Sequence, residues 1–183
     1  MPLPKFKPEH QPRLFTEPLG NHGHVRTLLG DIAERLTARL FNGRRYRTDC
    51  RSDYCPDVTA GGLFFEVKTI GNSNHTFVYE GRLEKDRRFW DAGNNLSYVL
   101  WNHGVVSRVC QDVFELECMF LATLKSIIVV SFPFLEQAAK MSPVTKLNSK
   151  YGHSDANPVY GAGYRIPISR VLALPHYEIE ICH

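Results

Sequence analysis

The sequence predicts an α/β fold in which helices flank a mixed sheet. Three observations support this. An amphipathic helical pattern lies near the N-terminus, short strand-like segments joined by a Gly-Gly turn follow it, and helical and strand patterns alternate afterwards. The chain has 183 residues, of which 43% are hydrophobic and 22% are charged. These values are typical of a globular domain with one sizeable core.

The chain is expected to consist of an arm and one domain. Residues 1–24 are rich in proline, histidine and lysine and show no periodicity, which predicts an extended N-terminal arm before a single domain over 25–183. The arm has no apolar core, so we do not expect a signal peptide. The apolar run at 127–130 is far shorter than the roughly 20 residues of a membrane span. The net charge of +3 permits a nucleic-acid partner without establishing one.

The first element is a helix that ends at Asn42-Gly43. A charged stripe at i, i+4 and i+8 should face water, and it consists of Asp31, Arg35 and Arg39. The apolar stripe on the other side of the helix consists of Leu29, Ile32, Ala33, Leu36 and Leu40.

Strands dominate the next segment, and helices then alternate with strands. Gly61-Gly62 predicts a hairpin between two of the strands. Strands are expected at 45–49, 56–60, 63–68, 96–101, 127–132 and, interrupted by Pro167, at 164–174. Helices are expected at 79–91, 114–126 and 134–141, and polar loops at 71–76 and 151–163.

The hairpin brings two acids and a lysine together. If Gly61-Gly62 forms a two-residue turn, Ala60 lies opposite Leu63 and Asp57 lies opposite Glu66. Strand alternation then puts Glu66 and Lys68 on one face and Phe65 and Val67 on the other. Asp57, Glu66 and Lys68 should therefore converge on one surface.

This convergence points to a metal site. Two directly opposed carboxylates repel each other, and a divalent cation such as Mg²⁺ would compensate that repulsion. The Lys68 ammonium could orient or help to deprotonate a water, or stabilise charge on a phosphate. The alternative is an ordinary surface cluster on an exposed hairpin. Apolar residues on both faces of the second strand favour an interior strand, where unpaired charge is costly.

The motif resembles a known superfamily. Pro56-Asp57, eight intervening residues and Glu66-Val67-Lys68 resemble the signature of the PD-(D/E)xK nucleases, which include restriction endonucleases, Holliday-junction resolvases, and recombination and repair nucleases. The resemblance covers about residues 28–101. It implies a restriction-endonuclease-like core of helix, three-stranded meander, helix and strand.

The resemblance also implies roles for individual residues. Asp57 and Glu66 would bind Mg²⁺, with Mn²⁺ able to substitute, and the Val67 carbonyl would be a further ligand. Lys68 would be the catalytic lysine. Many members carry one more acid on the preceding helix, and Glu34 matches that catalytic, metal-binding role, although an exposed helix glutamate is the alternative.

Residues after the lysine are candidates for DNA contact. Polar loop donors lie beside the expected metal site at Asn72, Ser73, Asn74 and His75. A basic helical patch follows at Arg82, Lys85 and Arg88, for which a solvated face balanced by acids is the alternative. The Tyr151–Tyr164 segment could stack on bases or could be an ordinary connection.

The expected function is Mg²⁺-dependent hydrolysis of DNA phosphodiester bonds by a homodimeric endonuclease. The short chain favours recognition of branched or junction DNA, as in resolvases that act in DNA recombination. A sequence-specific, type II-like restriction endonuclease and a non-catalytic DNA-binding module are the alternatives. The sequence has neither GxxxxGK[ST] nor GxGxxG, so we expect no nucleotide cofactor.

The five cysteines are scattered, and Cys50 and Cys55 alone have a spacing that suggests zinc. Reduced thiols in the cytoplasm are the simpler interpretation. We expect the protein to lie on the nucleoid when it binds DNA.

Overall fold

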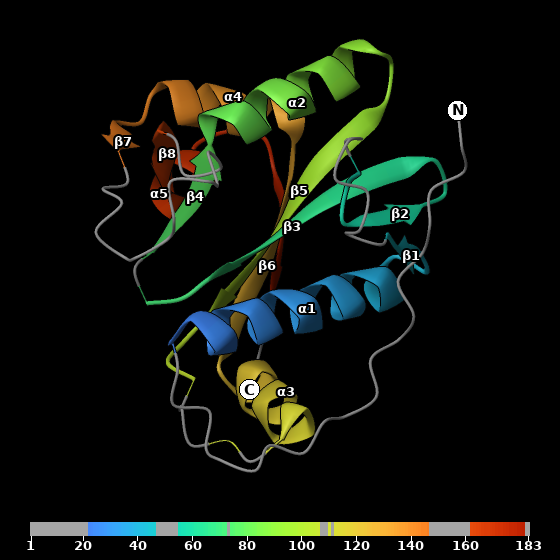
Figure 1. Cartoon of the computed structure of the whole chain (residues 1–183), viewed down its shortest axis with the longest axis vertical. Helices are drawn as coiled ribbons and strands as arrows, with labels where there is room; N and C mark the ends of the chain where they lie inside the picture. Colours follow the sequence, from blue (N-terminus) through green and yellow to red (C-terminus); the bar gives the residue numbers. More distant parts are fainter. Residues whose placement is uncertain are drawn as a thin grey trace, which may run out of the picture.

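The computed structural model describes residues 22–46, 55–72, 74–106, 110, 112–146 and 162–181. A six-stranded mixed sheet lies between two pairs of helices, which confirms the predicted mixed α/β fold (Figure 1). One face packs against α1 (His22–Leu40) and α3 (Val113–Ala122). The other face packs against α2 (Glu80–Asp91) and α4 (Phe132–Lys140). The sheet therefore separates two hydrophobic cores.

The main sheet has the strand order β1-β2-β3-β5-β6-β9, and a second sheet has the order β4-β8-β7. In the main sheet β3 and β5 are parallel, and the other neighbours are antiparallel. The main-sheet strands are β1 Arg44–Arg45, β2 Val58–Ala60, β3 Leu63–Ile70, β5 Asn95–His103, β6 Leu124–Ser131 and β9 Tyr177–Glu180. The second sheet contains β4 His75–Tyr79, β7 Val144–Lys146 and β8 Ala162–Pro167, and α5 spans Ile168–Leu172.

Helix α1 buries more charge than its sequence pattern predicts. Arg35, expected on a water-facing stripe, is buried and forms an ion pair with Glu117 of α3. The expectation was wrong because α3 packs beside α1 and supplies a carboxylate for the guanidinium. The helix ends before Asn42, which adopts a left-handed φ of 50°. Asparagine tolerates this conformation better than most residues do.

The hairpin forms with the predicted register from Val58 to Phe65, whereas the expected pairing of Asp57 with Glu66 is not part of this register. Gly61 and Gly62 both have left-handed φ values, 56° and 83°, as a two-residue primed turn requires. The paired residues are Val58 with Phe65, Thr59 with Phe64 and Ala60 with Leu63.

The two faces of β3 also follow the prediction. Phe65 and Val67 are buried in the core under α1 and α3. Phe64 projects to the opposite face and packs edge-on against Phe89 of α2, with 5.0 Å between the ring centroids. Glu66 and Lys68 share that face by alternation.

Several elements differ from the sequence prediction. The loop expected over 71–76 is interrupted by β4, which begins at His75. The strand expected over 164–174 stops at Pro167, and the chain turns into α5. The short or solvent-exposed strands β7 and β9 carry too little hydrophobic pattern to be predicted. Residues 47–54, with Cys50, and most of the 151–163 loop lie outside the described residues.

Across the described ranges, every helix is too short or too polar to cross a membrane.

A glycine between α1 and β1 holds the hairpin close to the helix. A Cβ added at Gly43 would lie 2.4 Å from the carbonyl oxygen of Thr59. We therefore expect Gly43→Ala to lower the free energy of unfolding by about 2 kcal/mol, since the backbone of β2 must move. Gly30→Ala is the matched control, because no atom lies within 4 Å of its added Cβ and alanine favours the helix by up to about 1 kcal/mol. Urea denaturation measures both, and equal effects would contradict this packing.

Candidate active site

Asp57 lies directly before β2, and three hydrogen bonds to backbone groups of other residues hold it there. Its N–H donates to the carbonyl of Phe65 (2.9 Å), and its carbonyl accepts from the N–H of Tyr46 (3.0 Å). Its carboxylate Oδ2 accepts from the N–H of Val67 (2.8 Å). The backbone pairing of β2 with β3 thus ends at Val58. Before Val58, the side chain of Asp57 contacts β3 in place of a paired backbone.

The Val67 carbonyl opens toward the same edge. In an extended strand the N–H and C=O of one residue point to the same side. Because the Val67 N–H points to the Asp57 carboxylate, its carbonyl faces the side where β2 has ended. Asp57 and the Val67 carbonyl therefore provide hard oxygen donors at one edge of β3.

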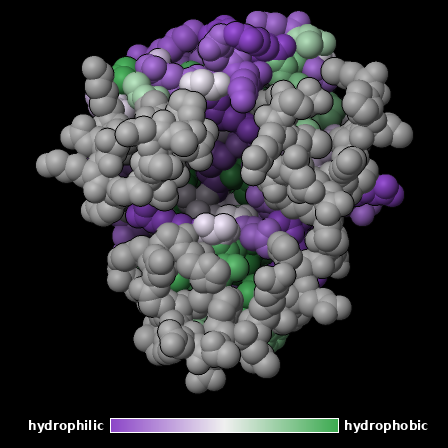
Figure 2. Space-filling view, viewed as in Figure 1, coloured by the Kyte–Doolittle hydropathy of each residue, from purple (hydrophilic) through white to green (hydrophobic). Residues whose placement is uncertain are grey.

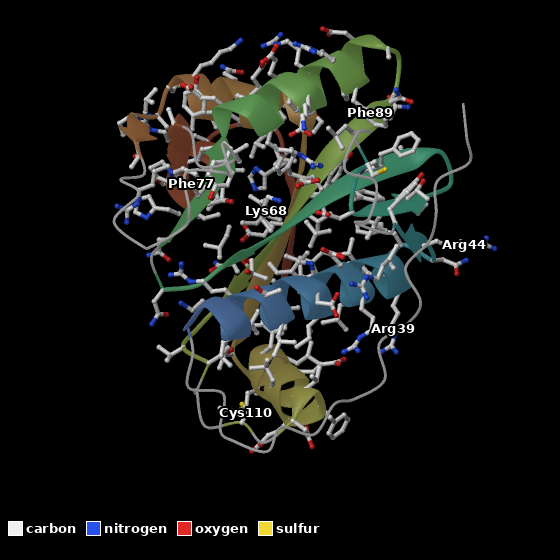
Figure 3. All side chains as sticks on the ribbon, viewed as in Figure 1. Arg39, Arg44, Lys68, Phe77, Phe89 and Cys110 are labelled. Carbon is white, nitrogen blue, oxygen red and sulfur yellow. The ribbon has the colours of Figure 1, made fainter. Side chains whose placement is uncertain are left out.

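Glu66 is 2% exposed, and cations contact both of its oxygens. Oε1 accepts from Lys68 Nζ at 2.5 Å, and Oε2 accepts from Arg82 Nη2. Figure 3 shows Lys68 on the side of β3 that faces α2, the helix that carries Arg82.

The contacts continue from Arg82 into the interior. Arg82 Nε donates to Asp86 Oδ1 (3.1 Å), one helical turn further along α2. Asp86 is fully buried and also accepts from the Tyr98 hydroxyl. Burial and the nearby Asp86 carboxylate raise the pKa of Tyr98 well above its ordinary value, so the phenol remains a donor. A continuous polar chain thus links β3, α2 and β5.

Burial is the largest factor that shifts the pKa of Glu66. Together with the negative charges of Asp57 and Asp86, burial raises this pKa from 4.5 to about 7. Lys68 and Arg82 offset only part of the shift. Burial lowers the pKa of Lys68, but the Glu66 and Asp57 carboxylates act more strongly together, so its pKa lies above the usual value. Lys68 is therefore an ammonium at neutral pH, and this favours charge stabilisation over proton abstraction.

The structure does not bring Glu34 to this cluster. Helix α1 lies against the opposite face of the sheet, and Glu34 binds Arg45 of β1 with 3.0 Å between Oε2 and Nη2. Arg45 also pairs with Asp31 of α1. Arg45 lies directly opposite Val58 on the neighbouring strand, and directly opposed residues share a face of the sheet. Because Val58 packs in the core beneath α1, Arg45 also lies on the α1 face.

The residues proposed for DNA contact do not all lie together. Arg82 turns inward to Glu66 and Asp86, whereas Lys85 and Arg88 are exposed on α2. Asn72 and Asn74 are exposed after β3. His75 is the first residue of β4 rather than a loop residue, and Ser73 lies outside the described residues.

The donor set suits a hard divalent cation. No cluster of three or more His, Cys, Asp or Glu side chains arranged for a metal ion occurs within the described ranges. The two carboxylates of Asp57 and Glu66 with the Val67 carbonyl nevertheless match Mg²⁺, which binds one or two carboxylates and keeps several waters. In the space-filling view hydrophilic residues gather at the top, where α2 lies in Figure 1 (Figure 2).

Sequence reasoning missed the inner part of the site. Arg82 was expected on an outer surface, although its i, i+4 spacing to Asp86 could have indicated an ion pair. Tyr98 gave no such signal, because only the parallel pairing of β3 and β5 places it beside Glu66.

The raised pKa of Glu66 predicts a pH-dependent stability. A carboxyl whose folded pKa is about 7 and whose ordinary value is 4.5 stabilises the fold below pH 4.5 and loses that contribution as the pH rises to 7. Between pH 4.5 and 8 in metal-free buffer, we expect the free energy of unfolding of Glu66→Gln to fall by about 3 kcal/mol less than that of the wild type. Urea denaturation of both proteins from pH 4.5 to 8 measures it, and parallel stability profiles would contradict the assignment.

Arg82 should matter more to stability than its exposed neighbour. Arg82→Met leaves Glu66 and Asp86 without their shared cation, and we expect a loss of about 3 kcal/mol. Arg88→Met is the matched control: its ion pair with Glu84 is exposed, and we expect a change below about 0.5 kcal/mol. Thermal and urea unfolding at pH 7 measure both, and similar losses would show that Arg82 has no interior role.

Comparisons of the chain with protein-family models, curated proteins and solved structures found no match. The functional assignment therefore depends on the motif and on the geometry around Asp57, Glu66 and Lys68.

Proposed function

We propose that this protein is a Mg²⁺-dependent endodeoxyribonuclease that hydrolyses phosphodiester bonds in DNA. One observation carries the proposal. The carboxylate of Asp57 is held against β3 by Val67, next to the buried carboxylate of Glu66 and the ammonium of Lys68. The pKa of Glu66 responds to the charges of both other groups, so the three lie within electrostatic reach of one another.

Each residue has a distinct role in this reaction. Asp57, Glu66 and the Val67 carbonyl would hold Mg²⁺, which when bound polarises a phosphate oxygen and acidifies a water. Lys68, kept protonated by the adjacent acids, neutralises negative charge that develops on the phosphate and orients the attacking water. Water attack and departure of the 3′-oxygen would leave a 5′-phosphate and a 3′-hydroxyl, as the superfamily resemblance implies.

Further observations support DNA as the substrate. Lys85 and Arg88 are exposed on α2, and Asn72 and Asn74 are exposed in the loop that leaves β3. The chain order of α1, β1 to β3, α2 and β5, with β4 inserted before α2, is compatible with the core that the resemblance implies.

We propose a structure-selective enzyme for branched or junction DNA. Lys85 and Arg88 would contact phosphates, and phosphate contacts do not distinguish one base sequence from another. A homodimer would present two sites to two strands. The second candidate is a sequence-specific, type II-like endonuclease. A non-catalytic DNA-binding module is less favoured, because it would have no use for the buried carboxylate of Glu66 beside that of Asp57.

Cleavage assays test the proposal directly. Four-way junction, linear duplex and single-stranded DNA are incubated with Mg²⁺, Mn²⁺ or EDTA. We expect metal-dependent cutting, fastest on the junction, and a loss of at least about 100-fold for Asp57→Asn, Glu66→Gln and Lys68→Met. Glu180→Gln, at the exposed far edge of the sheet, is the control and should cut normally. Equal cutting by wild type and Lys68→Met would refute the mechanism.

A further inference from the structure

The small sheet presents an aromatic and basic surface that the proposed reaction does not use. Along β4, Thr76 and Val78 are buried, whereas His75, Phe77 and Tyr79 alternate with them and are half-buried. In the adjacent strand β8, exposed Arg165 lies directly opposite Phe77. The outer face of the sheet thus carries rings and a guanidinium, while the inner face contributes Val78 to the core.

The ring of Phe77 is held in a defined position. A Cβ added at Gly163 would lie 2.4 Å from Phe77 Cζ and 2.7 Å from Cε1, so the ring covers the space that a side chain at position 163 would fill. Tyr79 packs against the ring edge-on, with 4.9 Å between the centroids and 79° between the planes. This packing fixes the Phe77 ring before any ligand binds, which reduces the entropy cost of stacking on it.

The charge of this surface suits a polyanion. No residue of strands β4, β7 and β8 is acidic, and the outer face carries His75 and Arg165. A base can stack on an aromatic ring whatever its identity, and a neighbouring arginine can bind the phosphate. The combination suits a nucleic-acid strand with unpaired bases.

The surface is connected to the candidate active site at both ends of β4. The Gly71–Asn74 segment joins His75 to β3, which carries Lys68. At the other end, α2 begins directly after Tyr79, and Arg82 of that helix binds Glu66. Phe77 and Lys68 lie on the same side of α2 (Figure 3).

We infer that the outer face of the β4-β8-β7 sheet binds an unpaired segment of the DNA substrate, with a base stacked on Phe77 and a phosphate at Arg165. The choice of DNA rests on the proposed nuclease function. Branched DNA would supply such a segment where its strands separate.

Binding in EDTA tests this inference apart from cleavage. Fluorescence anisotropy compares a 15-nucleotide oligothymidine, the same strand with abasic sites, and a blunt duplex. We expect Phe77→Leu to weaken oligothymidine binding about 10-fold and duplex binding less than about 2-fold, as the loss of one stacked base implies. The abasic strand should bind wild type and Phe77→Leu equally. Arg165→Gln should weaken binding and reduce its salt dependence.

The controls separate stacking from folding. Tyr177→Leu removes an equally aromatic side chain that is 79% exposed on β9, and it should bind like wild type. Phe77→Trp keeps a stacking ring and should restore binding. Equal affinity of Phe77→Leu and wild type for oligothymidine would overturn the inference, as would tighter binding of the matching oligouridine RNA. Normal Phe77-dependent binding by a protein that does not cut DNA would refute only the proposed function.

Discussion

The buried carboxylate of Glu66 is the constraint that organises this structure. A lone carboxylate in a protein interior is costly, so the charge requires neighbours that compensate it. Lys68 contacts one oxygen from the same strand, and Arg82 contacts the other from α2. Arg82 in turn requires Asp86, which is held by Tyr98 of β5. One acid on β3 thereby determines polar positions on three elements and orients α2 over the sheet.

The sheet keeps two sets of charges apart. On the α1 face, Arg45 binds Asp31 and Glu34, and Arg35 binds Glu117. These pairs attach the short strand β1 and helix α3 to α1. On the α2 face, the Glu66 network lies beside the open edge where β2 ends at Asp57. Because the hydrophobic cores of the two faces are separate, the ion pairs of the α1 face can stabilise the scaffold without neutralising the candidate active site.

Local backbone geometry places the reactive groups. The side chain of Asp57, rather than its backbone, meets the N–H of Val67, so a carboxylate occupies the position where a strand would have continued. This end of β2 leaves the Val67 carbonyl facing the same edge. The next strand of the chain, β4, leaves the main sheet for the small one. The proposed chemistry and the proposed binding of an unpaired strand thus involve consecutive segments of the chain.

The hairpin turn and the two faces of β3 could be predicted from local sequence patterns. Two glycines impose the turn and hence the register, and the period of two assigns Glu66 and Lys68 to one face. The sequence also predicted α2, although not the inward direction of Arg82. Which charges meet depends on the packing of distant elements: Glu34 pairs with Arg45, and Tyr98 approaches Glu66 through the parallel β3–β5 pairing. Those partners are distant in the sequence, and local patterns carry no information about which elements pack together or which buried charge must find a counter-ion.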